Sequence, residues 1–276
     1  MLTFDDGYAS TIEWAVPLCR KYRMPAIFFL NSACIDNKRL APDNLVCYVV
    51  NELGTEVVNA AVRSVKGASA ESLKVKSLPD IFSRVLPAIS LAERKAFLEA
   101  LAHLAGIDGT RLAKEAGLYL TREQVNDLAN SGFQIGNHTY SHVHCRTLTR
   151  SGFVDEIDRN KTELEAMSGR PVRSFSLPYG SSADLTRELA EHLDRSGHEL
   201  VFLSESTANR LGAKHPHFDR VSIHGRSEDE LFCEIEILPR LRGMRNRLFR
   251  SRKPVDACQG AQTWDRLSTI SENHTN

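Results

Sequence analysis

The sequence has no excess of charge of either sign. Among its 276 residues, 35 Lys and Arg balance 35 Asp and Glu, so the formal net charge is zero. No overall field therefore attracts the chain to nucleic acid or another polyanion. Aromatic residues make up only 7% of the chain, and they are not interleaved with a basic stripe as single-strand binding requires. We therefore expect no nucleic-acid partner.

Long apolar runs and paired cysteines are also missing. No stretch reaches 18 apolar residues, so we expect no membrane span. The six cysteines, at positions 19, 34, 47, 145, 233 and 258, are scattered and form no C-x-x-C pair. That pattern favours reduced cysteines over a zinc ribbon or a disulfide framework. The chain as given opens without the charged and apolar regions of a signal peptide, so we expect a cytoplasmic protein unless a leader precedes Met1.

Short apolar runs alternate with amphipathic helical patterns. The strand-like runs cover residues 25–30, 133–135, 174–177, 200–203 and 221–223. Helical patterns follow at 121–132, 149–168 and 184–196, each ending at or next to a glycine. Strands that alternate with helices predict an α/β protein with a parallel sheet or barrel.

Residues 36–120 break this rhythm, because they are mostly amphipathic helix. We interpret them as a helical insertion after the second strand, which either shapes a substrate cleft or caps the core. The predicted organisation is a barrel over 1–235 that includes this insertion, and a basic then polar tail over 236–276. Within the tail, residues 240–253 hold six arginines and one lysine. They indicate either a solvated helix end or a peripheral contact with an anionic polymer or membrane surface.

Two adjacent acids follow the first apolar residues, in Thr3-Phe-Asp-Asp-Gly7. Paired carboxylates at a strand end are costly unless a cation or a proton is shared between them. Acids at the C-terminal mouth of a barrel strand are typical of catalysis. The alternative is a helix N-terminus, which Asp5 and Asp6 would also cap well.

Two histidines four residues apart follow the run at 133–135, in His138-Thr-Tyr-Ser-His142. On a helical turn this spacing would place both imidazoles on one face, within reach of one ion. His144 would point elsewhere on such a turn. One carboxylate with two imidazoles is a good ligand set for Zn²⁺ or Co²⁺. Such an ion lowers the pKa of its water towards about 7, and the second aspartate can then act as the general base.

Together the acid pair and the histidine pair resemble the first two motifs of the polysaccharide deacetylases, carbohydrate esterase family four or the NodB-homology domain. The resemblance extends over residues 2–225, and the helical insertion is its least typical part. It implies a distorted (β/α) barrel that hydrolyses the acetamido group of an N-acetylhexosamine. It also implies that Asp5 is the general base, while Asp6, His138 and His142 hold the metal.

A third motif, Phe175-Ser-Leu-Pro-Tyr-Gly180, matches the Pro-Tyr-Gly part of a family loop. By resemblance, the backbone N–H of Tyr179 would donate to the tetrahedral oxyanion. Proline and glycine alone would also explain a plain turn here. Ser176 stands where many members carry an arginine that orients the base, and Arg173 is too displaced to replace it.

The family also uses a histidine near the end of the barrel to protonate the leaving amine. His224, after the run at 221–223, is the best placed candidate, although a structural histidine is the alternative. His215 and His217 flank a proline in a predicted loop and rank lower.

The resulting hypothesis is a metal-dependent hydrolase of a non-peptide carbon–nitrogen bond. Its partner would be an acetylated glycan, and its cofactor a divalent metal, Zn²⁺ or Co²⁺. One alternative is a carbohydrate-binding barrel that has lost turnover. Another is a related metal amidohydrolase or O-acetyl esterase that acts on a small molecule.

Overall fold

The protein is described here by a computed structural model, which covers residues 1–209, 217–223 and 227–249. The chain divides into two compact units, Met1–Leu203 and Ser204–Asn276. The predicted domain bounds at 235 and 236 stay a prediction.

Five short parallel strands form the sheet of the first unit, and their order in the sheet is their order in the chain. They are β1 (Leu2–Phe4), β2 (Ala26–Leu30), β3 (Gln134–Asn137), β4 (Ser174–Ser176) and β5 (Leu200–Leu203). Four of the five predicted strands are thus confirmed to within two residues. Because parallel strands all end at the same edge, the residues that follow β1 and β3 come close together.

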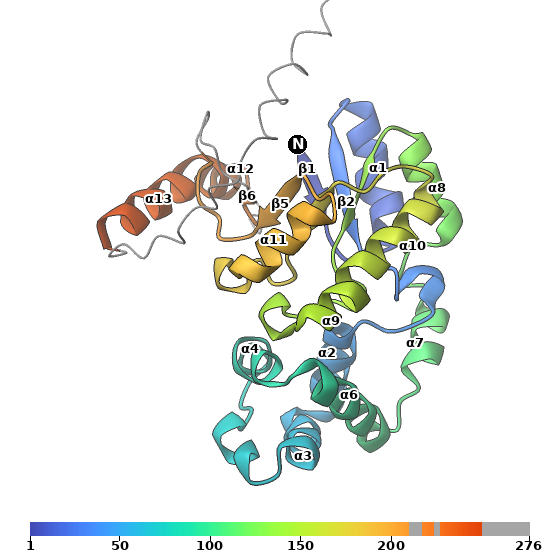
Figure 1. Ribbon diagram of the computed structural model, residues 1–276, viewed down its shortest axis with the longest axis vertical. Helices are drawn as coiled ribbons and strands as arrows, with labels where there is room; N and C mark the ends of the chain where they lie inside the picture. The colour runs from blue at the N-terminus through green and yellow to red at the C-terminus, as the bar shows by residue number, and fades with distance from the viewer. Residues whose placement is uncertain (210–216, 224–226, 250–276) are drawn as a thin grey trace, which may run out of the picture. The chain divides into compact units, whose positions relative to one another are not determined.

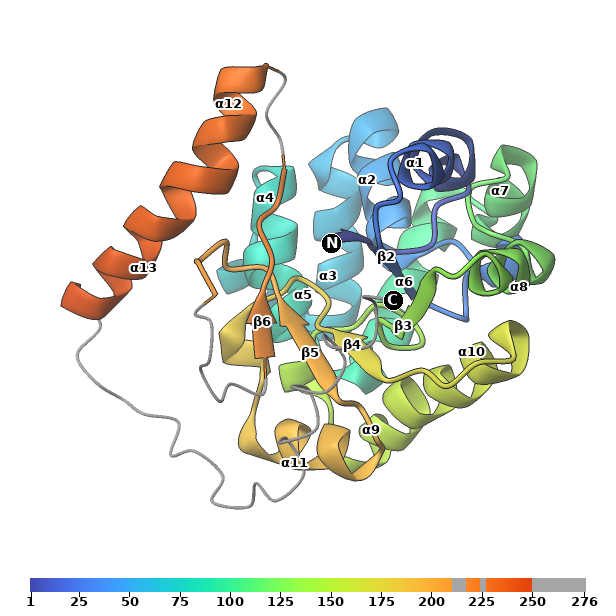
Figure 2. The same cartoon turned by 90° about the horizontal axis from the view of Figure 1, so that it is seen from above.

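Helices cover this sheet (Figure 1). They are α1 (Ser10–Lys21), α8 (Arg122–Asn130), α9 (Arg150–Phe153), the π-helical η5 (Val154–Asp158), α10 (Arg159–Ser168) and α11 (Arg187–Arg195), with the short 3₁₀ turns η4 (Cys145–Thr147) and η6 (Ser182–Asp184). Figure 2 shows α8 and α10 beside each other.

Local sequence explains where these helices begin and end. The Thr121 side chain accepts from the Gln124 N–H in a capping box that begins α8, and left-handed Gly169 ends α10. Helix α11 begins after Thr186, which caps it, so the predicted start at Asp184 is wrong. Asp184 is instead fully buried.

The core depends on β2, whose five residues are all buried. Phe28 and Leu30 pack into a cluster with apolar residues of α8, β3 and α10. Ile27 and Phe29 face the opposite way and pack against Phe202 of β5. A strand buried on both faces explains the unbroken apolar run in the sequence.

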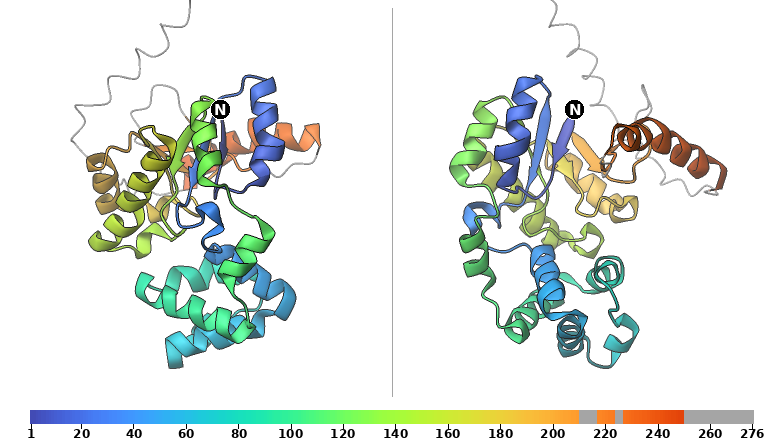
Figure 3. Two further views of the ribbon diagram at one scale, coloured as in Figure 1. Left: turned by 90° about the vertical axis from the view of Figure 1, so that its right-hand side faces the viewer. Right: turned by 180° about the vertical axis from the view of Figure 1, so that it is seen from behind.

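The helical insertion after the second strand is confirmed. It consists of η1 (Ile35–Asn37), α2 (Pro42–Leu53), α3 (Thr55–Lys66), η2 (Gly67–Leu73), α4 (Leu78–Asp80), the π-helical η3 (Ile81–Val85), α5 (Leu86–Ala88), α6 (Leu91–Ala105) and α7 (Gly109–Ala116). These helices form a group beneath the strands in both views of Figure 3. They enclose an apolar cluster that includes Val46, Val58, Phe97 and Leu101.

The second unit contains β6 (His217–Asp219) and a helix built from α12 (Glu228–Phe232), the π-helical η7 (Cys233–Ile237) and α13 (Leu238–Phe249). Ser227 and Glu230 form the capping box that begins this helix. The predicted strand at 221–223 is wrong, because these residues are irregular. Their β-branched side chains favour a strand only where neighbours pack on them, and Ile223 is exposed.

Within the described part of the chain, no helix has the length and apolar character needed to cross a membrane. The five cysteines there, at positions 19, 34, 47, 145 and 233, are free.

Gly136 in β3 gives a direct test of the core. A Cβ built on Gly136 would overlap the buried ring of Phe29, so the ring or the strand would have to move. We expect Gly136→Ala to lower the free energy of unfolding in urea by about 1–3 kcal/mol.

Gly109→Ala is the matched control, because its new Cβ would lie an ordinary 3.5 Å from the Cβ of Leu40. Equal stabilities of the two variants would contradict this account of the core.

Candidate metal centre

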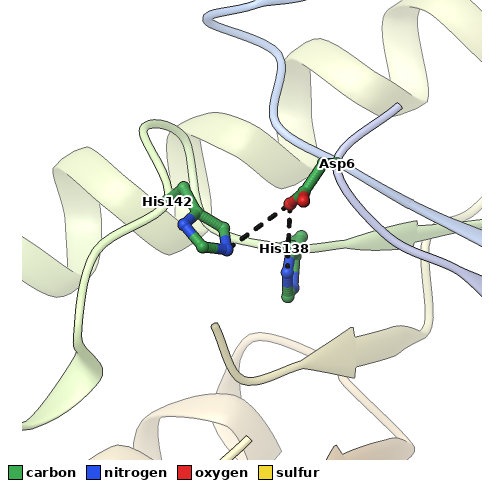
Figure 4. A group of neighbouring side chains, drawn as sticks. All are labelled: Asp6, His138 and His142. Carbon is green, nitrogen blue, oxygen red and sulfur yellow. Dashed lines mark ion pairs between the residues drawn. The ribbon is translucent and has the colours of Figure 1, made fainter. Parts of the chain in front are cut away.

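The two acids and the two histidines of the sequence motifs meet at the C-terminal edge of the sheet. Asp5 and Asp6 directly follow β1, and His138 directly follows β3. His142 reaches the same place from the loop that continues from His138, so the three side chains drawn in Figure 4 converge. The imidazoles are buried, while the acids keep 29% and 27% of their side-chain surface exposed.

One oxygen of Asp6 faces both imidazoles. Its Oδ1 lies 3.6 Å from His138 Nε2 and 3.4 Å from His142 Nε2. These three potential ligand atoms all lie within 4.8 Å of one another. Asp6 Oδ1 is buried, and no hydrogen-bond donor of the described residues reaches it. Asp5 stands next to this group, with its Oδ2 3.7 Å from His138 Nε2.

These residues fit a divalent ion. A tetrahedral ion with ligand bonds of about 2.0–2.2 Å holds neighbouring ligand atoms roughly 3.3–3.6 Å apart. The two distances from Asp6 Oδ1 match this spacing and are too long for good hydrogen bonds. A buried acceptor without a donor is costly, and a shared cation would remove that cost. Asp6, His138 and His142 could therefore hold Zn²⁺ or a similar ion.

The loop that carries the histidines is not helical, so the predicted helical turn is wrong. Thr139 and His142 have left-handed φ values of 61° and 54°. The Asn31 amide binds the carbonyls of His138 and Thr139, and the Ser141 N–H donates to the Glu156 carboxylate at 2.8 Å. The loop backbone, and not helix periodicity, therefore brings the imidazoles together.

Three side chains of the site sit on strained backbone. Asp6, His142 and Tyr179 all have positive φ, at 69°, 54° and 63°. Non-glycine residues rarely adopt this region, and they do so mainly where the surroundings hold them and function requires it. Arg23, Asp36, Asn37 and Thr139 of the first unit share this conformation, so the backbone supports these three positions only together with the convergence of their side chains.

The ring of His138 is oriented by the backbone of Ser176. His138 Nδ1 donates to the Ser176 carbonyl at 2.8 Å, which leaves Nε2 as the acceptor that faces Asp6. Ser176 thus contributes to the site through its main-chain carbonyl. Arg173, which the sequence indicated to be too displaced to act here, pairs with Glu199 on the surface.

Sequence reasoning missed Asp43 and Arg94, which both come from the helical insertion. Asp43 Oδ2 lies 3.0 Å from His142 Nδ1, and Arg94 Nη2 donates to the His142 carbonyl at 2.6 Å. Burial lowers the pKa of His142, but the carboxylates of Asp43 and Asp6 outweigh it and raise the pKa overall. Burial likewise raises the pKa of Asp43, but the contact with His142 outweighs it and lowers the pKa. The only sequence signal was an acid after Pro42 at a helix start, which also suits the helix dipole.

Tyr179 lies beside these groups. Its hydroxyl donates to Asp43 Oδ1 at 2.7 Å, and its ring stacks on His144 with centroids 3.7 Å apart. Burial and the Asp43 charge raise the pKa of Tyr179 well above its usual value. No acceptor among the described residues engages its backbone N–H. His144 in turn contacts buried Asp184, with Nδ1 and Oδ2 3.0 Å apart.

His224, the predicted catalytic acid, lies outside the described residues. His215 lies outside them too. His217 begins β6 and so does not lie in the predicted loop.

Comparison with known proteins agrees with this geometry. The family model described as polysaccharide deacetylase matches residues 1–197, so the chain belongs to the polysaccharide deacetylase family. No curated protein matches the sequence.

Several solved structures are similar to the chain. The deacetylase PplD of Streptococcus pyogenes, in complex with acetate, is 13% identical; the match covers 85% of this chain and 69% of PplD, with a TM-score of 0.50. BC0361, a polysaccharide deacetylase from Bacillus cereus, is 14% identical over 85% of this chain and 50% of its own, with a TM-score of 0.47. IcaB from Ammonifex degensii is 19% identical over 80% of this chain and 66% of its own, with a TM-score of 0.45.

The chain therefore spans half of BC0361. The family match and the likeness to PplD confirm the predicted fold class, a distorted (β/α) barrel of the NodB type.

The loop that carries His138 and His142 rests on a buried polar layer that ends at His198. Asn137 Oδ1 accepts from the Thr139 N–H, and Asn137 Nδ2 lies 3.1 Å from His198 Nε2. Burial lowers the pKa of His198 to about 3. In the unfolded chain His198 takes up a proton near pH 6.5, whereas in the folded protein it stays neutral until about pH 3. Falling pH therefore favours the unfolded state across this window.

We expect His198→Gln to reduce this pH dependence in the metal-free protein. Between pH 7.5 and 5.5 the wild type should lose roughly 1 kcal/mol more unfolding free energy than the variant. Urea unfolding at the two pH values measures the difference. Parallel losses in both proteins would show that His198 is not held neutral.

Proposed function

We propose that this protein is a metal-dependent hydrolase that removes N-acetyl groups from an N-acetylhexosamine-containing polysaccharide or oligosaccharide. The observation that carries the proposal is the buried Asp6 oxygen between two imidazole nitrogens, with a second carboxylate beside it. Membership of the polysaccharide deacetylase family supports the reaction class. An acetylated glycan would be the partner.

Asp6, His138 and His142 would hold a divalent metal, Zn²⁺ or Co²⁺. When bound, the ion would polarise the acetamido carbonyl and lower the pKa of a nearby water. Asp5 adjoins the three candidate ligands and does not belong to their set, so its carboxylate can accept the proton of the attacking water.

Tyr179 would stabilise the oxyanion that forms as water adds to the carbonyl. Its backbone N–H has no acceptor in the described part of the chain, and a preorganised donor of this kind lowers the barrier. The new carbon–oxygen bond then replaces the carbon–nitrogen bond, which yields acetate and the sugar amine. The amine must leave with a proton, and His224 stays the predicted donor.

Acetate release from chitooligosaccharides and poly-N-acetylglucosamine tests the proposal. We expect release that a chelator stops and that added Zn²⁺ or Co²⁺ restores. Metal binding without acetate from any acetylated glycan would favour a binding barrel that has lost turnover. Activity confined to O-acetyl esters or small amides would favour a different hydrolase.

The Asp5→Asn variant distinguishes the role of the general base from that of the metal ligands. Loss of a general base should lower turnover by about 10²–10⁴-fold, while the metal content stays at the wild-type level because the three ligands remain. Steady-state rates and elemental analysis measure the two quantities.

Asp127→Asn, an exposed change on α8, is the matched control and should leave both unchanged. Wild-type turnover in Asp5→Asn would contradict the assignment of the base.

A further inference from the structure

The first turn of α2 places one carboxylate of the insertion inside the candidate metal centre. Asp43 is the second residue of α2, where an acid would ordinarily face solvent near the positive end of the helix dipole. Its side chain is instead only 22% exposed. Both of its oxygens contact residues that lie about 100 or more positions further along the chain.

The two oxygens of Asp43 engage different parts of the site. Oδ2 lies 3.0 Å from Nδ1 of His142, and Oδ1 accepts the Tyr179 hydroxyl at 2.7 Å. His142 is a candidate metal ligand, and Tyr179 carries the candidate oxyanion donor. One side chain therefore joins the two elements that would both act on the carbonyl oxygen of the substrate.

The contact with His142 favours a proton on the ring nitrogen that faces away from Asp6. The Asp43 carboxylate favours this proton on Nδ1 by its charge and proximity, although the pair is not aligned as a hydrogen bond, so that Nε2 remains an acceptor directed towards Asp6 Oδ1, 3.4 Å away. Carboxylates that bind metal-ligating imidazoles in this way fix the ring and raise its basicity.

The contact with Tyr179 restrains a residue with unfavourable backbone geometry. Tyr179 has a φ of 63°, which a tyrosine adopts only when its surroundings hold it. Stacking on His144 fixes one face of the ring, and the bond to Asp43 fixes its hydroxyl end. Both contacts therefore determine where the Tyr179 N–H points.

Asp43 is itself held rigidly. Its neighbour Asn44 accepts from the Tyr8 hydroxyl at 3.0 Å and donates to the Tyr119 hydroxyl at 2.6 Å. Tyr119 also accepts from the Ala41 N–H at 2.9 Å, so the start of α2 is fixed both to Tyr8, which follows β1, and to Tyr119 at the end of the insertion. A side chain on such a support can position others.

We propose that Asp43 is a positioning residue that orients the metal ligand His142 and the oxyanion loop at Tyr179 together. The inference rests on the proposed function for its catalytic part, whereas its metal-binding part depends only on the ligand geometry. It makes the helical insertion a component of the site.

Three variants separate the two contacts. Asp43→Ala removes both, Asp43→Asn keeps the shape but removes the negative charge beside His142, and Tyr179→Phe removes only the tether. Glu52→Gln is the matched control, because it removes one exposed negative charge from the same helix. Each protein is examined for Zn²⁺ affinity by chelator competition, for kcat and KM at saturating Zn²⁺, and for the Tm of its metal-free form.

We expect Asp43→Ala and Asp43→Asn to bind Zn²⁺ about 10–100-fold more weakly than the wild type. Tyr179→Phe should keep wild-type Zn²⁺ affinity but lose about tenfold or more in kcat, with little change in KM. Asp43→Ala should show the same loss in kcat even when Zn²⁺ is saturating. Glu52→Gln should match the wild type throughout.

Wild-type Zn²⁺ affinity in both Asp43 variants would overturn the inference. A fall in metal-free Tm large enough to account for the whole loss of Zn²⁺ affinity would overturn it as well. If Asp43→Ala does not fold, Asp43→Asn keeps the test intact because it preserves the shape of the side chain. A wild type that releases no acetate would refute the proposed function alone, since the Zn²⁺ measurements still decide the role of Asp43.

Discussion

The site depends on one buried carboxylate oxygen. Asp6 Oδ1 faces Nε2 of His138 and of His142 at 3.6 and 3.4 Å, and no donor of the described residues satisfies it. Burying such an atom between two imidazoles is costly, and a bound cation would offset that cost. The parallel order of β1, β2 and β3 supplies the geometry, because it brings the ends of β1 and β3 to one edge. The left-handed backbone at Asp6 and His142 then sets the direction in which their side chains point.

The helical insertion reaches this site from outside the strand–helix repeat. It packs around its own apolar cluster. It also supplies Arg94, which contacts the His142 carbonyl, and Asp43, which contacts the His142 ring. The His142 backbone and side chain are therefore both held by the insertion, whereas His138 is held by the Ser176 carbonyl of β4. The two imidazoles thus depend on different parts of the first unit. The proposed role of Asp43 would make the insertion part of the chemistry of the site.

Much of this arrangement was predictable from sequence, where the pattern was local. Apolar runs located β2 to β5 because each strand is buried, and the acid and histidine motifs located the candidate ligands. Other features depend on distant contacts. The 138–142 spacing suggested a helical turn, but the loop is shaped by Asn31 and Glu156, which no local pattern reveals. Asp43 shows in the sequence only as an acid in the first turn of a helix, because its partners lie far along the chain. The strand predicted at 221–223 does not form, because the Ile223 side chain is exposed and a strand would bring it no packing.

The central claim is that Asp6, His138 and His142 share one divalent ion. Its most direct test is a crystal structure of the protein grown with Zn²⁺, with anomalous diffraction data collected on both sides of the zinc absorption edge. The account predicts one strong anomalous peak about 2.0–2.2 Å from Asp6 Oδ1 and from Nε2 of both histidines, with Asp5 outside bonding distance. A fully loaded crystal whose zinc lies elsewhere, or whose Asp6 oxygen stays unbound, would contradict it.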